Sequence, residues 1–203
     1  MRIALVDYGA GNLASVLKAF RALGADVHLV SDVSGLAGAR GIVVPGVGHF
    51  SATASLGHDW RGAIREALDA GIPLLGICVG LQWLFEGSTE APGSPGLGLI
   101  RGRCFRLEGD DVKVPHVGWN QLDLADRRSR LFAGIASGSS AYFTHSYAAP
   151  VVDETIATTT HAVPFSSAVE RDLVFGVQFH PEKSGRTGLR VLENFLHVVR
   201  EGR

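Results

Sequence analysis

The sequence has 203 residues, of which 46% are hydrophobic, and its formal net charge at pH 7 is -1. This length and hydrophobic content are typical of one globular domain, so we expect a single domain over residues 1–203. Nucleic-acid binding needs a basic face, which 19 basic against 20 acidic side chains do not indicate.

The apolar runs are too short for membrane insertion or for secretion. None approaches the ~20 residues that cross a bilayer. The N-terminal run stops at Asp7, short of the ~7–15 apolar residues of a signal peptide. We therefore expect a cytoplasmic protein without a membrane partner.

The two cysteines, Cys78 and Cys104, are too few for a disulfide framework. No Cys-x-x-Cys or His-Glu-x-x-His spacing indicates zinc. We expect neither a metal nor a cofactor.

The first half of the chain alternates strands and helices. Continuous apolar runs predict strands over 2–8, 25–30, 41–46 and 73–78. Helical spacing predicts a helix capped by Asn12 and ended by Gly24, a second capped by Asp59, and a third over 79–86. This alternation predicts a mostly parallel sheet flanked by helices, with right-handed crossovers.

Ligand sites in parallel sheets lie beyond the carboxyl ends of the strands. Asp7, the segment 45–48 and Cys78 each follow a predicted strand, so we expect them at one edge of the sheet.

The second half has a different pattern. A Gly- and Pro-rich loop over 88–98 is followed by short segments that predict antiparallel strands, added to the sheet edge or folded over it. These segments cover 101–108, 112–120, 140–148, 154–160, 164–170 and 173–180. A final helix over 185–202 closes the chain. The predicted fold class is α/β.

Cys78 allows two interpretations. A free cysteine is most often a small buried hydrophobe. Here, however, Gly76 and Gly80 flank it at a strand-to-helix turn, which exposes a side chain to an approaching substrate. The backbone N–H of Val79, at the start of the helix, could then stabilise an oxyanion.

A nucleophilic thiol needs a base and a group that orients it. Among eight histidines, His180 is distinguished because it ends a predicted strand and is followed by Pro181 and Glu182. A surface turn is the alternative interpretation of this segment. With Cys78, however, the sequence favours a Cys–His–Glu triad.

A second oxyanion donor is expected from the segment "PGVGHF" over 45–50. Gly46 and Gly48 flank Val47, and glycine permits a peptide flip at low energetic cost. An ordinary glycine-rich turn is the alternative.

These motifs resemble the class I (triad) glutamine amidotransferases, a flavodoxin-like family that hydrolyses glutamine and passes the ammonia to a partner. More narrowly, they resemble the branch of glutaminase subunits that serve imidazole glycerol phosphate synthases in histidine biosynthesis. The resemblance extends over essentially the whole chain. It is carried by "DYGAGNLASV" (7–16), "PGVGHF" (45–50), "GICVGLQ" (76–82), "VPHVGWN" (114–120), "YFTHSY" (142–147) and "HPEKS" (180–184).

The resemblance implies a role for each matching residue. Cys78 would be the nucleophile, His180 the general base and acid, and Glu182 its orienting group. The backbone N–H groups of Val47 and Val79 would form the oxyanion hole. The glutamine-binding residues would be Gly46, Gly48, Gln82, His145, Ser146 and Tyr147. Ser146 replaces a common Thr, and Val79 and Leu81 replace a common Leu and Met, changes that should leave these contacts intact.

The resemblance also implies a partner, a (β/α)8-barrel cyclase that forms a heterodimer with the chain and receives its ammonia. Asn12, Trp119, Tyr142 and Lys183 match positions on the face that meets the barrel. Each also has a simpler interpretation: a helix cap, a partly buried strand aromatic, an edge residue and a solvated charge.

Two other functions stay open at this point. One is a different enzyme on the same fold, either a stand-alone cysteine hydrolase or a glutaminase for another synthase. The other is a binding module in which Cys78 is structural.

Overall fold

The centre of the fold is a nine-stranded sheet with the strand order β2-β1-β3-β4-β12-β11-β10-β7-β8. The structure is a computed structural model that describes residues 2–110, 112–125 and 128–202. The strands of the central sheet are β1 (Arg2–Val6), β2 (Asp26–Val30), β3 (Gly41–Val44), β4 (Leu74–Ile77), β7 (His116–Leu124), β8 (Ser139–His145), β10 (Thr155–His161), β11 (Val163–Arg171) and β12 (Val174–Val177). A small second sheet contains β5 (Gly87–Ser88), β6 (Arg103–Arg106) and β9 (Tyr147–Ala148).

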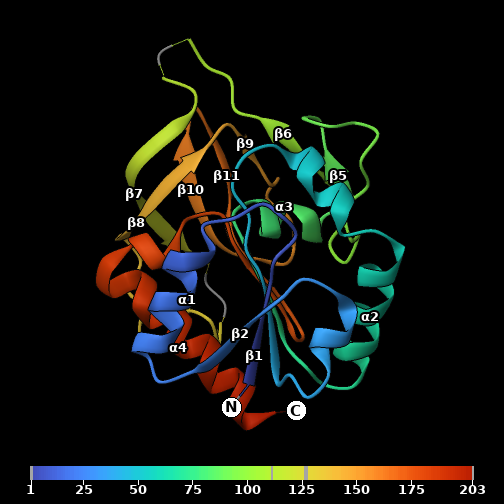
Figure 1. Ribbon diagram of the computed structural model, residues 1–203. Coiled ribbons are helices and arrows are strands. Elements are labelled where there is room, and N and C mark those ends of the chain that lie inside the picture. The colour runs from blue at the N-terminus through green and yellow to red at the C-terminus, as the bar shows by residue number, and fades with distance from the viewer. Residues whose placement is uncertain (1, 111, 126–127, 203) are drawn as a thin grey trace.

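Helices cover both faces of the central sheet. Helices α1 (Leu13–Ala22) and α4 (Gly185–Glu201) lie side by side on one face, and α2 (His58–Asp69) lies on the other (Figure 1). The shorter elements are α3 (Val79–Leu84), η1 (Val33–Leu36), η2 (Phe50–Ser55) and η3 (Pro181–Lys183). None of the helices that the structure describes has the length and apolar content needed to cross a membrane.

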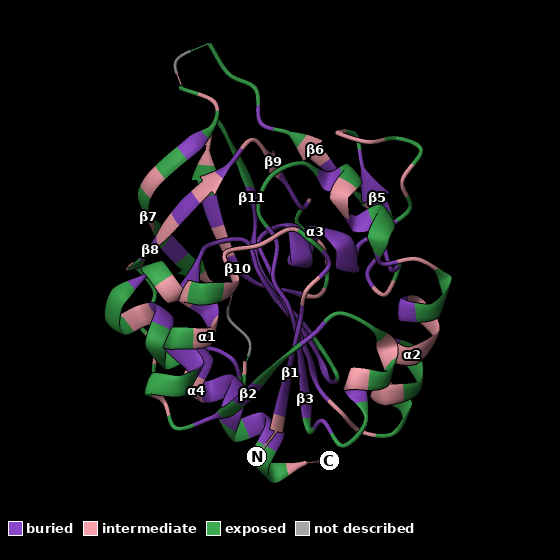
Figure 2. Cartoon of the chain, viewed as in Figure 1, coloured by how far each residue is buried: buried purple, intermediate pink, exposed green. Residues whose placement is uncertain are grey.

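Burial explains the two kinds of sequence pattern. Strands β3 and β4 are buried at every residue, as the continuous apolar runs predict for strands covered on both faces, and β3 is accordingly purple in Figure 2. Strand β12, which was not predicted to be covered on both faces, is buried at every residue as well. Strand β7 instead has exposed or half-buried residues between its buried ones, because one of its faces lies toward solvent. The α/β class with a parallel first half and added antiparallel strands is therefore confirmed.

One expectation about the second half is wrong. The sequence pattern predicts 173–180 as an antiparallel strand added at the sheet edge or folded over the sheet, yet β12 lies in the middle of the sheet and pairs in parallel with β4. Only its other neighbour, β11, is antiparallel to it. The parallel register pairs Ile77 with Val177, so the carboxyl ends of β4 and β12 meet side by side.

The starts of two helices also differ from the expectation. Asn12 occupies the N-cap position of α1, but its side chain makes no capping hydrogen bond. Helix α2 begins at His58 after Gly57, so Asp59 lies in the first turn instead of capping the helix. A carboxylate there still lies near the positive end of the helix dipole.

Candidate active site

Cys78 stands on a sharp turn between β4 and α3. Its backbone has φ 55° and ψ −108°, a conformation that a non-glycine residue adopts only under constraint from its surroundings. Close packing explains why glycines stand on either side of Cys78. A methyl group on Gly80 would overlap the Val44 carbonyl oxygen, and one on Gly76 would lie 2.5 Å from the Gly80 carbonyl oxygen. The turn is therefore possible only with glycine at both positions.

His180 reaches the cysteine because β12 runs beside β4. The Cys78 amide donates to the Val177 carbonyl at 2.8 Å, which fixes the two strand ends together. His180 Nδ1 lies 2.9 Å from Glu182 Oε1, and their side chains are only 2% and 1% exposed. His180 Nε2 is buried without a hydrogen-bond partner among the described residues. The predicted orienting contact between Glu182 and His180 is thus present.

Burial alone would lower the pKa of His180, but the Cys78 thiol and the Glu182 carboxylate outweigh it. Both groups favour the charged ring, and together they raise the pKa of His180 to about 10. No hydrogen bond of standard geometry joins Cys78 Sγ to His180 Nε2, but the cysteine is close enough to raise the pKa of the ring. At neutral pH the ring therefore carries a proton that it can donate.

Gln178 is a contact of the nucleophile that the sequence motifs did not identify. Its Nε2 donates to Cys78 Sγ at 3.6 Å, and its Oε1 accepts from Gln82 Nε2 at 3.2 Å. Gln82 Nε2 also donates to the Tyr147 carbonyl at 2.8 Å. A signal for Gln178 exists, since residues two apart on a strand share a face and His180 lies two residues further on.

The segment 45–48 packs against the start of α3. A methyl group on Gly46 would lie 2.5 Å from the Tyr8 hydroxyl and 2.7 Å from Val79 Cβ. Gly48 has a positive φ of 91°, and Val47 is 36% exposed. The two predicted oxyanion donors, Val47 and Val79, therefore come from neighbouring segments.

A cavity of about 320 Å³ opens beside the nucleophile. Its lining contains seven of the predicted site residues, namely Gly48, Cys78, Val79, Gln82, His145, Ser146 and Tyr147. The predicted catalytic, oxyanion-hole and glutamine-binding residues outside this lining are Gly46, Val47, His180 and Glu182. The contact of each predicted residue with glutamine stays a prediction. A larger cavity of about 820 Å³, lined by Arg65, Arg130 and Arg171 among others, contains neither cysteine nor histidine.

The lining also includes Glu90, Pro115 and Thr144, which sequence reasoning missed. Glu90 Oε2 accepts from the Phe50 amide at 2.7 Å, which ties the loop after β5 to the start of η2. No local pattern singles out a carboxylate in a Gly- and Pro-rich loop, so only the fold places it at the cavity.

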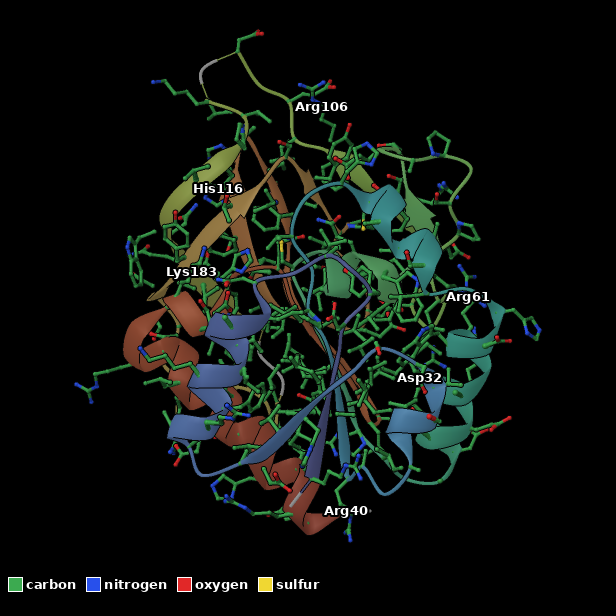
Figure 3. The ribbon with its side chains drawn as sticks, viewed as in Figure 1. Asp32, Arg40, Arg61, Arg106, His116 and Lys183 are labelled. Carbon is green, nitrogen blue, oxygen red and sulfur yellow. The ribbon has the colours of Figure 1, made fainter. Side chains whose placement is uncertain are left out.

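Three of the four predicted interface residues form one cluster on the outer face of β7 and β8. The rings of Trp119 and Tyr142 meet edge to face with centroids 6.1 Å apart. Lys183 Nζ lies 5.8 Å from the Tyr142 ring centroid, on the side of the molecule that carries β7 (Figure 3). Trp119 is 59% exposed, so it is not a core residue. Asn12, the fourth, lies at the start of α1.

Both cysteines are buried, but Cys78 lines the cavity and Cys104 does not. Burial raises the pKa of the Cys104 thiol far above the usual range. Such a thiol packs as a small hydrophobe and does not act as a nucleophile. Over the described ranges, no group of three or more His, Cys, Asp or Glu side chains could hold a metal ion.

The model of the glutamine amidotransferase class-I family matches residues 4–199 of the chain. The chain therefore belongs to this family. Solved structures of similar fold include PurLQS from Thermotoga maritima (TM-score 0.75, 19% identity, covering 97% of each chain). Another is the glutaminase domain of CTPS from Trypanosoma brucei (TM-score 0.69, 18% identity, covering 100% of this chain and 95% of that one).

Curated relatives define the branch of the family. The imidazole glycerol phosphate synthase subunit HisH of Thermococcus kodakarensis is 51% identical, over 97% of this chain and 100% of its own length. The protein of the same name from Moorella thermoacetica is 46% identical, over 98% of this chain and 95% of its own. Within the class-I family, the chain belongs to this HisH branch.

Proposed function

We propose that the chain, as a single cytoplasmic domain, is the glutamine amidotransferase subunit of an imidazole glycerol phosphate synthase. It would hydrolyse glutamine and pass ammonia to a (β/α)8 cyclase subunit in a heterodimer. The observation that carries the proposal is that His180, held by Glu182, lies beside Cys78 where two parallel strands end, and that Cys78 lines a cavity. Relatives of up to 51% identity over nearly the whole chain support it.

The reaction begins with attack by sulfur on the glutamine side-chain amide. The Cys78 thiolate bonds to the amide carbon, and the carbonyl oxygen becomes an oxyanion held by the N–H groups of Val79 and Val47. Gln178 Nε2, 3.6 Å from Sγ, stabilises the thiolate before the attack. The raised pKa of His180 keeps the ring protonated for the next step.

The first tetrahedral intermediate collapses when the carbon–nitrogen bond breaks. His180 gives its proton to the departing nitrogen, which leaves as ammonia, and a thioester to Cys78 remains. The neutral ring then takes a proton from water, whose oxygen attacks the thioester. Breakage of the carbon–sulfur bond releases glutamate and restores the thiolate and the imidazolium. Glu182 holds the Nδ1 proton throughout at 2.9 Å.

The cavity offers two acceptors for the substrate ammonium group. Glu90 is a carboxylate in the lining, and Gln82 Oε1 is a buried acceptor without a partner among the described residues. A buried unpaired acceptor is costly, so a ligand that donates to it gains binding free energy. We assign the ammonium group to Glu90 and Gln82, and the rest of the substrate backbone to Ser146 and Tyr147.

The segment 45–48 provides a means of regulation. Gly46 and Gly48 on either side of Val47 make rotation of the Val47 peptide inexpensive. If the Val47 N–H points away from the site at rest, hydrolysis is slow until the loaded partner turns it inward. Loss of one oxyanion donor typically costs about 3–4 kcal/mol in the barrier.

Kinetic assays and labelling test this proposal. Glutamine hydrolysis is measured for the chain alone and for its complex with the cyclase partner in the presence of the cyclase ligand. We expect much faster turnover in the loaded complex. An electrophilic glutamine analogue should modify Cys78 and leave Cys104 unmodified, as peptide mass spectrometry can show. Labelling of Cys104 alone, or equal rates with and without the partner, would contradict the account.

A further inference from the structure

Three imidazole rings gather where β7, β8 and β10 meet. His116 begins β7 (Figure 3), His145 ends β8 and His161 ends β10. The His116 ring stacks on His161 with centroids 4.1 Å apart and meets His145 edge to face at 5.1 Å. His116 and His145 are buried. Buried ring nitrogens need partners, so their hydrogen bonds determine which tautomer each ring adopts.

The direction of the hydrogen bonds is fixed at the end nearest the cavity. His145 Nδ1 lies 2.9 Å from the Tyr147 carbonyl oxygen, which can only accept, so Nδ1 carries the proton. Burial, with the charges of neighbouring histidines, lowers the pKa of His145 to about 3. The ring is therefore neutral, and its Nε2 is an acceptor. His116 Nδ1, 3.1 Å away, must donate to it.

The other end of this series of hydrogen bonds, at Asn120, independently gives the same direction of donation. Burial and His161 lower the pKa of His116 to about 4, so that ring is neutral too and its Nε2 accepts. The donor is Asn120 Nδ2, at 3.2 Å. The Asn120 amide is itself oriented, because Nδ2 donates to the Thr160 carbonyl and Oδ1 accepts from the Gln121 amide. Asn120, His116 and His145 thus form a one-way donor chain.

This donor chain ends on an atom of the glutamine cavity. The Tyr147 carbonyl accepts from both His145 Nδ1 and Gln82 Nε2, which occupies both of its lone pairs. Gln82 Nε2 also donates to Gln178 Oε1. With both amide protons in use, the Gln82 amide cannot rotate, and its Oε1 is the atom left unpaired.

We propose that His145, His116 and Asn120 are positioning residues for glutamine binding. Their donor chain fixes the Tyr147 carbonyl, which fixes the Gln82 amide with its oxygen free for the substrate. This inference rests on the proposed function, since it assigns that oxygen to the glutamine ammonium group. None of the three side chains takes part in the chemical steps.

The test removes one donor while the ring stays in place. His145→Phe keeps a planar ring among Phe143 and Phe165. It leaves the Tyr147 carbonyl without its histidine donor, and His116 Nδ1 without its acceptor. In the complex with the cyclase partner, we expect the KM for glutamine to rise about fivefold, the effect of one lost neutral hydrogen bond, with kcat within about twofold. The rate of Cys78 alkylation by iodoacetamide should not change.

Two further variants separate positioning from packing. His145→Asn places an amide nitrogen where Nδ1 stood, so it should restore the KM to within about twofold of the wild type. His161→Phe is the matched control, because His161 stacks on His116 but makes its Nε2 hydrogen bond to the Lys113 carbonyl, outside the donor chain. It should leave the KM unchanged. An unchanged KM in His145→Phe, with only a lower melting temperature, would overturn the inference.

The wild-type protein provides a test that needs no variant. Long-range ¹H–¹⁵N spectra should show His116 and His145 as neutral Nδ1–H tautomers at pH 7. An Nε2–H tautomer or a charged ring at either position would remove the donor chain and overturn the inference. A wild-type complex that does not hydrolyse glutamine would overturn the proposed function, and this inference with it.

Discussion

Glu182 sets both the orientation and the charge of the His180 ring, because Oε1 accepts the Nδ1 proton at 2.9 Å. Glu182→Gln keeps the shape but can present an amide donor to Nδ1 and so favour the wrong tautomer. We expect kcat for glutamine hydrolysis to fall about 10³- to 10⁴-fold with little change in KM, as for other triads that lose their carboxylate.

A carboxylate far from the site is the control for this prediction. Glu193→Gln removes the exposed ion pair with Arg190 on α4 and should leave kcat unchanged. Steady-state assays of the partner complex measure both variants. If Glu182→Gln retained more than about a tenth of wild-type kcat, Glu182 would not be the orienting group.

At this scale, sequence predicted the residues that have a distinctive neighbourhood. Cys78 was recognisable from its flanking glycines and His180 from the strand end before Pro181 and Glu182. Glu90 had no signal, and Gln178 had only its position two residues before His180, because a glutamine at a strand end and a glutamate in a loop have many ordinary uses. Their roles depend on which segments the fold brings to the cavity.

At the scale of elements, the turn around Cys78 predicts unequal effects of two glycine substitutions. Gly80→Ala should destabilise the protein by about 3 kcal/mol or more, since the new methyl would overlap the Val44 carbonyl. Gly62→Ala, on α2 with open space around it, should stabilise by about 0.5–1 kcal/mol. Urea denaturation measures both. Equal free energies of unfolding would show that the turn is not tightly constrained.

Strands were predictable individually but not in their pairing. Continuous apolar runs identified β1, β3 and β4 because each is buried on two faces. The different pattern of the second half predicted 173–180 as a strand, but not its neighbour β4, nearly a hundred residues earlier. Pairing between distant segments is decided by the packing of the whole sheet, which a local pattern does not contain. The missed pairing is the one that joins His180 to Cys78.

For the whole molecule, the buried histidine pair predicts how stability depends on pH. Folding lowers the pKa of His116 to about 4 and of His145 to about 3, so the unfolded chain binds more protons below about pH 6.5. This contribution is present in full above pH 6.5 and is lost as the pH falls. The raised pKa of His180 adds a small slope of the opposite sign near pH 6.5 and none below about pH 5.5, where the ring is protonated in both states.

The expected loss from the two rings together is on the order of 5 kcal/mol in the free energy of unfolding between pH 6.5 and 4. Urea titrations at several pH values measure it. His145→Phe should show a shallower dependence over the same range, because one of the two rings is gone. A free energy of unfolding that rises on acidification would contradict the neutral state of the pair.

The proposed partner face, which contains Trp119, lies at one edge of the central sheet. Trp119→Ala should weaken the affinity for the cyclase partner at least about tenfold, because exposed tryptophans are typical interface hot spots. Leu29→Ala is the control, since Leu29 is 49% exposed on β2, the strand at the opposite edge. Titration calorimetry measures both. Equal weakening by the two variants would place the partner elsewhere.

The central claim is that Cys78 supplies ammonia from glutamine to a cyclase partner. The most direct measurement compares imidazole glycerol phosphate synthesis by the reconstituted complex with glutamine and with added ammonia, for the wild type and for Cys78→Ala. We predict that Cys78→Ala abolishes synthesis from glutamine and retains synthesis from ammonia. Glutamine-dependent synthesis by Cys78→Ala at the wild-type rate would contradict the account.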